Sequence, residues 1–189
     1  MPKTMYSTAT TIDGFIADPS HSLDWLFAVE GDGEGPPDFA GFMAGIGAMA
    51  MGRSTYEWVA AHLRTSGERW QDLHGDTPCW VFTHRELPGI PGATVHFVQG
   101  DVAPVHARMA QAAGDRDVWL VGGGELVGQF ADRGLLDEIR LNVAPVMLGA
   151  GAPLLPRRLG SDRLELAEVT RRGPFVDLVY RVRGGPPAA

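Results

Sequence analysis

The sequence predicts an α/β fold in which helices lie on the faces of a mostly parallel sheet, closed by an antiparallel pair of strands. Short apolar strand patterns alternate with segments whose apolar residues recur at three- and four-residue spacing, which is typical of helices packed on a sheet. The last two strand patterns flank the sequence Arg-Arg-Gly-Pro at residues 171–174, which indicates a hairpin.

Each element follows from its own pattern, taken in chain order. Apolar runs predict strands at residues 5–11, 48–51, 79–83, 94–98, 118–121 and 138–143, and hairpin strands at 164–170 and 175–182. Helical spacing of apolar residues predicts helices at 38–45, 54–63, 102–113 and 125–133.

Length and composition fit one globular domain. The chain has 189 residues, of which 44% are hydrophobic and 21% charged, which is enough to bury a core. We assign residues 1–183 to a single domain and expect residues 184–189, Gly-Gly-Pro-Pro-Ala-Ala, to form a disordered tail. A start without a long apolar stretch and the shortness of all apolar runs predict a cytoplasmic protein with no membrane partner.

Charge and reactive side chains exclude several function classes. The net charge of −7 and the scattered arginines argue against nucleic acid as a partner. The single cysteine, Cys79, stands among apolar residues and is expected to be a buried small hydrophobe. The six histidines lack metal-site spacing, so no metal is expected, and the chain has no Gly-x-Ser-x-Gly nucleophile motif.

The most informative segment is residues 118–126, Val-Trp-Leu-Val-Gly-Gly-Gly-Glu-Leu, an apolar strand that runs through three glycines into a helix pattern. Glycine lets a backbone approach a ligand closely, and the N–H groups of the following helix favour an anion. Such turns also occur for packing reasons alone. Two further strand ends, at residues 52–55 and 83–85, carry hydroxyl and cationic groups. Ligands of open α/β sheets bind at the carboxyl ends of strands, so the three ends together predict a nucleotide site.

Two arginines at these ends bear on the choice of nucleotide. The guanidinium groups of Arg53 and Arg85 have the fork geometry that suits a phosphate monoester, which favours NADPH over NADH. The alternative is that both are solvated surface arginines. The usual dinucleotide fingerprint, G-x-G-x-x-G after the first strand, does not occur.

Five motifs, in order along nearly the whole chain, resemble the dihydrofolate-reductase-like proteins. More closely, they are similar to the family named after the reductase C-terminal domain of the bifunctional riboflavin-biosynthesis deaminase-reductase. The motifs are Thr-Thr-Ile-Asp-Gly-Phe-Ile-Ala at 10–17, Leu-Asp-Trp-Leu at 23–26, Gly-Arg-Ser-Thr-Tyr-Glu at 52–57, Gly-Gly-Gly-Glu-Leu at 122–126 and Pro-Val-Met-Leu-Gly-Ala-Gly-Ala-Pro-Leu at 145–154. The resemblance implies a dihydrofolate-reductase-like three-layer fold and a stand-alone reductase domain that uses NADPH.

The resemblance also implies where the cofactor lies. The nicotinamide would lie beside the first strand, against Ala9, Ile16 and Trp25, although each of these could equally be plain core. The pyrophosphate would lie between two helix starts, at Ser54 and Thr55 and at residues 123–126. The adenosine 2′-phosphate would lie near Arg53 and residues 83–85. The peptide bond between Gly122 and Gly123 would be cis. The expected cofactor-binding residues are Ala9, Ile16, Gly52, Arg53, Ser54, Thr55, Thr83, His84, Arg85, Val121, Gly122, Gly123, Gly124, Glu125 and Leu126.

Three residues are candidates for the reaction itself. Asp38 follows the acidic, glycine-rich loop at 30–38, at the place where dihydrofolate reductases carry their active-site acid, or it is simply a helix N-cap. Asn142 aligns with a polar position that supports that acid, or it is a turn former. For Trp25, substrate contact and packing are both open.

The implied activity is NADPH-dependent hydride transfer to a pteridine- or pyrimidine-type small molecule. The family activity is 5-amino-6-(5-phosphoribosylamino)uracil reductase, but the Asp-x-Pro-x-Leu-x-x-Arg segment that usually follows the second helix start is missing here. The alternatives are dihydrofolate reductase activity and a nucleotide-binding protein without efficient catalysis. Relatives are commonly homodimers, and the apolar segment at 145–155 is either a patch covered by a second subunit or a buried crossover.

Overall fold

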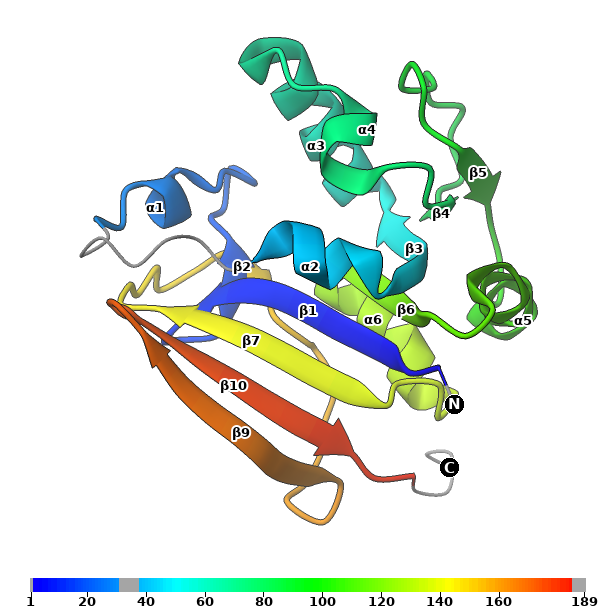
Figure 1. The fold of residues 1–189 in the computed structure, drawn as a ribbon. Coiled ribbons are helices and arrows are strands. Elements are labelled where there is room, and N and C mark those ends of the chain that lie inside the picture. Colours follow the sequence, from blue (N-terminus) through cyan, green and yellow to red (C-terminus); the bar gives the residue numbers. More distant parts are fainter. Residues whose placement is uncertain (1, 31–37, 185–189) are drawn as a thin grey trace.

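The predicted α/β class is confirmed by a computed structural model, which describes residues 2–30 and 38–184. The main sheet has eight strands, all within two residues of the predicted bounds: β1 (Thr4–Thr11), β3 (Ile46–Gly52), β4 (Cys79–Phe82), β5 (Val95–Val98), β6 (Asp117–Gly122), β7 (Glu138–Ala144), β9 (Leu164–Arg172) and β10 (Phe175–Val182). Their order is β5-β4-β3-β6-β1-β7-β10-β9 (Figure 1). The six strands from β5 to β7 are parallel, and β10 runs antiparallel to β7 and to β9.

Four predicted helices are present, and two short ones were not predicted. The predicted helices are α2 (Phe39–Ala44), α3 (Arg53–Ser66), α5 (Val102–Ala113) and α6 (Gly124–Asp132). The short additional helices are α1 (Asp24–Phe27) and α4 (Trp70–His74). Residues 185–189 of the expected tail and residues 31–37 of the acidic loop lie outside the described residues.

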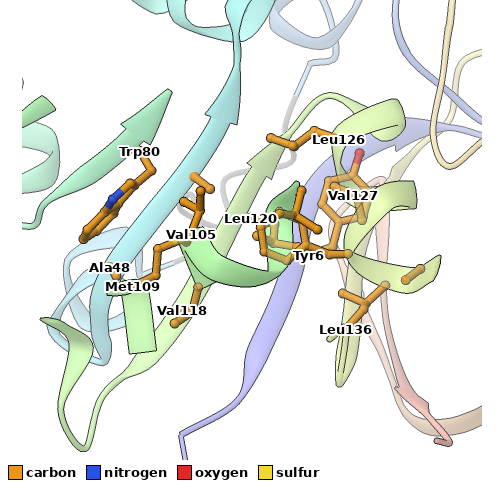
Figure 2. Close-up of a cluster of buried hydrophobic side chains, with 14 of the residues drawn as sticks. Tyr6, Ala48, Trp80, Val105, Met109, Val118, Leu120, Leu126, Val127 and Leu136 are labelled. Atoms are coloured by element: carbon orange, nitrogen blue, oxygen red, sulfur yellow. The ribbon is translucent and has the colours of Figure 1, made fainter. Parts of the chain in front are cut away.

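Two apolar cores form because successive residues of a strand point to opposite faces of the sheet. On one face, Tyr6 and Leu120 pack against α5 and α6, as Figure 2 shows for Met109 and Val127. On the other face, the next residue along each strand packs against α2, α3 and α4. This second core includes Met5, Met49, Tyr56, Trp70 and Trp119. As predicted, Cys79 is buried there, and burial raises the pKa of its thiol.

A second, two-stranded sheet joins the early and late loops. Its strands, β2 (Phe15–Ala17) and β8 (Ala152–Pro153), are too short to show a pattern in the sequence. Beside it, the Asp13 carboxylate accepts hydrogen bonds from the backbone N–H groups of Leu148 and Gly149, at 3.0 and 2.7 Å. Two of the motifs that carried the family resemblance therefore meet in space and hold each other in place.

The apolar segment at 145–155 was expected to be either an exposed patch or a buried crossover, and it is partly each. Met147 is 69% exposed, whereas Leu154 and Leu155 pack against the first core. The homodimer expected from this segment stays a prediction. In the described parts of the chain, no helix is long and apolar enough to cross a bilayer.

Candidate active site

A cleft of about 1650 Å³ runs from the carboxyl ends of β3, β4 and β6, past β1, to the face formed by β7, β10 and β9. Its walls include most of the predicted site residues. These are Ala9, Ile16, Gly52, Arg53, Ser54, Thr55, Thr83, His84, Val121, Gly123, Gly124, Glu125, Leu126 and Asn142. Among the described residues, Trp25, Asp38, Arg85 and Gly122 are predicted site residues that do not line it.

Two helix starts meet at one end of the cleft. Gly52 precedes α3 and Gly123 precedes α6; both have extended backbone, and neither helix start has a side-chain cap. A Cβ placed on Gly52 would meet nothing closer than the backbone of Gly123 and Gly122, at 3.8 and 3.9 Å. The first N–H groups of a helix have no partner within it, and they carry the positive end of the helix dipole. Two such ends with open glycines form a cradle that fits the pyrophosphate of a dinucleotide.

The three consecutive glycines serve different structural purposes. Gly122 has a φ of 133°, which glycine alone adopts readily, and the expected cis bond to Gly123 is confirmed. Gly123 has open space on the cleft side, since its nearest neighbour for an added Cβ is Ile16 Cδ1 at 3.9 Å. A Cβ on Gly124 would instead lie 2.5 Å from the carbonyl oxygen of Pro153 and would collide with the carbonyl of Leu154. The third glycine is therefore required by packing.

The two arginines expected at the 2′-phosphate differ in position. Arg53 lines the cleft with Thr83 and His84, and its guanidinium pairs with Glu57 one turn along α3 at 2.9 Å. Arg85 is exposed, and its backbone N–H donates to Thr83 Oγ1 at 3.0 Å. Arg53 alone of the two is therefore placed to bind a phosphate inside the cleft.

The expected apolar wall is partly replaced by neighbouring residues. Ala9 and Ile16 line the cleft, as predicted. In α1, however, the cleft is lined by Leu26 and Phe27 instead of the predicted Trp25. Trp25 is half-buried beside them, and its indole N–H has no hydrogen-bond partner among the described residues. Phe27 stacks on Trp58 of α3 with ring centroids 6.4 Å apart, so α1 is held against α3 at the rim.

The far side of the cleft carries a polar cluster that the sequence revealed only in part. Asn142 on β7 donates from Nδ2 to Asp177 Oδ1 on β10 at 2.6 Å. Arg172 at the end of β9 donates from Nε to the other oxygen of Asp177 at 3.0 Å. All three residues line the cleft. A carboxylate within the apolar strand sequence Phe-Val-Asp-Leu-Val-Tyr was the signal that could have identified Asp177.

Farther along β7, a buried carboxylate on the same cleft wall binds two cations. Glu138 on β7 is 3% exposed and binds Lys3 Nζ at 2.9 Å and the guanidinium of Arg140. Burial by itself raises the pKa of Glu138, but the hydrogen bonds from Lys3 and Arg140 outweigh burial and bring the pKa below its ordinary value. Glu138 therefore remains ionised and fixes Arg140 on the cleft wall.

Asp38 is the N-cap of α2. Its Oδ1 accepts a hydrogen bond from the backbone N–H of Gly41 at 2.8 Å, and the residue is exposed. The helix that it caps contributes Phe39 and Phe42 to the cleft. Of the two roles open for Asp38, the structure displays capping, and its proton-donating role stays a prediction.

Known proteins similar to this chain share its fold over nearly its full length. The structure titled a putative riboflavin biosynthesis protein from Shewanella sp. PV-4 has a TM-score of 0.75 and 24% identity, covering 97% of this chain and 99% of that one. One crystal form of Acinetobacter baumannii RibD has a TM-score of 0.69 and 18% identity, covering 97% of this chain but 58% of that one. These likenesses establish the fold.

Sequence comparison establishes the family. Two uncharacterized proteins of Bacillus subtilis are similar throughout: YwjB is 33% identical over 182 residues, covering 94% of this chain and 97% of that protein. YyaP is 29% identical over 187 residues, covering 93% of each. The model of the RibD C-terminal domain matches residues 2–178. The chain therefore belongs to the RibD C-terminal domain family, and this membership supports a reductase-like domain.

Proposed function

We propose that this protein is an NADPH-dependent reductase that transfers a hydride to a pteridine- or pyrimidine-type small molecule. The observation that carries the proposal is the meeting of two uncapped helix starts at Gly52 and Gly123 in a cleft that continues past β1 to a polar face. The cradle suits a pyrophosphate, Arg53 suits a 2′-phosphate, and the remaining cleft has room for a second ring system.

In the mechanism, NADPH supplies the hydride when bound, and the protein contributes binding, orientation and exclusion of water. The first N–H groups of α3 and α6 would hold the pyrophosphate, with Ser54 and Thr55 at the same helix start. Ala9 and Ile16 would exclude water from the nicotinamide face. The substrate ring would lie on the side of the cleft that carries Asn142.

Titration of the purified protein with NADPH and then NADH, followed by calorimetry, tests the cofactor site. We expect preference for NADPH, because a bidentate arginine contact to a phosphate is charge-assisted. Arg53→Ala should weaken NADPH about tenfold or more and change NADH binding little. Arg85→Ala is the matched control, since Arg85 does not line the cleft and its loss should leave both affinities unchanged.

Equal losses for NADPH and NADH in Arg53→Ala would remove Arg53 from the 2′-phosphate site. No binding of either cofactor to the wild type would contradict the reductase proposal as a whole. After binding is measured, loss of nicotinamide absorbance with dihydrofolate or with an aminouracil substrate distinguishes the two candidate activities.

Asp38→Asn separates the two roles of Asp38. Asparagine is as good an N-cap as aspartate, so the variant should keep its stability, whereas Asp38→Ala should lose about 1 kcal/mol. Because the structure shows the carboxylate bound to its own helix, we expect turnover by Asp38→Asn to match the wild type. A tenfold or greater loss of turnover with unchanged stability would instead identify Asp38 as the proton source.

A further inference from the structure

The polar cluster of Asn142, Asp177 and Arg172 lies on strands β7, β10 and β9, away from the two helix starts proposed to hold the cofactor. We propose that Asp177 binds the substrate by accepting hydrogen bonds from an exocyclic amino group and the neighbouring ring N–H of a planar heterocycle. This inference rests on the proposed function and identifies the substrate edge that the same cleft recognises. It assigns substrate binding to a carboxylate on β10, whereas the sequence indicated Asp38 as the candidate active-site acid.

Strand register places Asp177 in line with the nicotinamide wall. Ala9 on β1 pairs with Asn142 on β7, and Asn142 pairs with Asp177 on β10. The row continues to Thr170 on β9. All four residues line the cleft, so they share one face of the sheet. Neighbouring strands lie about 4.8 Å apart, which puts Asp177 roughly 10 Å across the sheet from Ala9.

The cluster leaves hydrogen-bonding capacity on the carboxylate. An ionised carboxylate accepts about four hydrogen bonds, and among the described residues Asp177 accepts one on each oxygen, from Asn142 and Arg172. These donors lie on β7 and β9, on either side of β10, so they fix the carboxylate in position. The Asp177 side chain is 25% exposed, enough for a ligand in the cleft to reach it. The free lone pairs suit a ligand edge with two adjacent N–H groups.

Neighbouring charges favour a neutral, donor-rich ligand here over an anion. The nearest cation, Arg172, is already paired with Asp177. Arg140, on the same cleft wall, is likewise already paired with Glu138. Glu168, on β9 two residues before Thr170, adds a second carboxylate to the same wall. A phosphate or carboxylate group would be repelled by both acids, whereas an amino group beside a ring N–H complements Asp177.

Pterin and lumazine test the proposal directly, because C2 carries an amino group in pterin and an oxo group, with an added hydrogen on N1, in lumazine. Fluorescence titration of the wild type, with and without saturating NADPH, should give at least tenfold tighter binding of pterin, since lumazine turns an oxygen toward the carboxylate. Asp177→Asn should weaken pterin binding about tenfold or more and abolish the preference. Glu165→Gln, which removes a β9 carboxylate outside the cleft lining, should retain wild-type binding of both.

Equal binding of pterin and lumazine by the wild type would overturn the proposal, whatever the stability of the variants. Retained preference in Asp177→Asn would also overturn it. NADPH affinity, measured separately, should be the same in the wild type and in Asp177→Asn. Failure of the wild type to bind NADPH would contradict the reductase proposal, while the comparison made without cofactor would still decide the role of Asp177.

Discussion

Gly52→Ala is expected to fold normally and to bind NADPH at least tenfold more weakly than the wild type. The backbone of Gly52 has φ −80° and ψ 168°, which alanine adopts without strain, and an added methyl would meet no protein atom closer than 3.8 Å. The methyl would therefore point into the cradle between the starts of α3 and α6. A pyrophosphate held there by backbone N–H groups would be displaced, and charge-assisted hydrogen bonds would be lost.

Gly124→Ala, in the same region, is expected instead to lower the stability of the fold. Its methyl would collide with the backbone carbonyls of Pro153 and Leu154, which cannot move without displacing β8. Overpacking of this kind costs about 1–3 kcal/mol, so we expect the free energy of unfolding to fall by about that amount. Urea denaturation measures the stability of both variants, and calorimetric titration measures their NADPH affinity.

The two variants distinguish a glycine that leaves room for a ligand, Gly52, from one that is required by packing, Gly124. If Gly52→Ala bound NADPH as tightly as the wild type, the pyrophosphate would not lie between the two helix starts. If Gly124→Ala were as stable as the wild type, the contact with residues 153 and 154 would not be a constraint on the sequence.

The strands of the main sheet could be predicted because each is rich in apolar or β-branched residues, in β9 alternating with polar ones, and is bounded by turn residues. The elements that were missed are short: β2 has three residues, β8 two, α1 four and α4 five. A pattern with a period of two or 3.6 residues cannot be recognised over such lengths. These elements form because the surrounding chain holds them, as when the N–H of Leu154 donates to the oxygen of Gly14 at 2.9 Å.

The two halves of the cleft were predictable to different degrees. The half proposed for the cofactor is built from strand ends followed directly by helix starts, so Gly52, Arg53 and Gly123 carry a local signal in the sequence. The half proposed for the substrate depends on pairing between distant strands: Asn142 and Asp177 are 35 residues apart. At Asp38 the local pattern supported both a cap and an acid, and the structure displays the cap.

Glu138 is the second position at which we expect a large effect, here on stability and its pH dependence. Glu138→Gln removes a buried negative charge that binds Lys3 and Arg140, whose side chains are 50% and 38% exposed. Because both cations can turn toward water, the expected loss is about 1.5–3 kcal/mol, the range for hydrogen bonds to charged groups. Glu57→Gln is the control, since it breaks an exposed pair on α3 that contributes about 0.3–0.5 kcal/mol.

The pH dependence follows from the lowered pKa of Glu138. A carboxyl whose pKa is lower in the folded than in the unfolded chain stabilises the fold above its unfolded pKa, and this contribution is lost as the pH falls through the folded value. With an ordinary value of 4.5, the wild type should lose stability as the pH falls below about 4.5. In Glu138→Gln this part of the acid dependence should be missing, so the stabilities of the two proteins should converge at low pH. Urea denaturation between pH 7 and pH 3 measures this difference. A gap between wild type and variant that stayed constant over this range would show that the ionised carboxylate, and with it the hold on Arg140 at the cleft wall, contributes nothing to the fold.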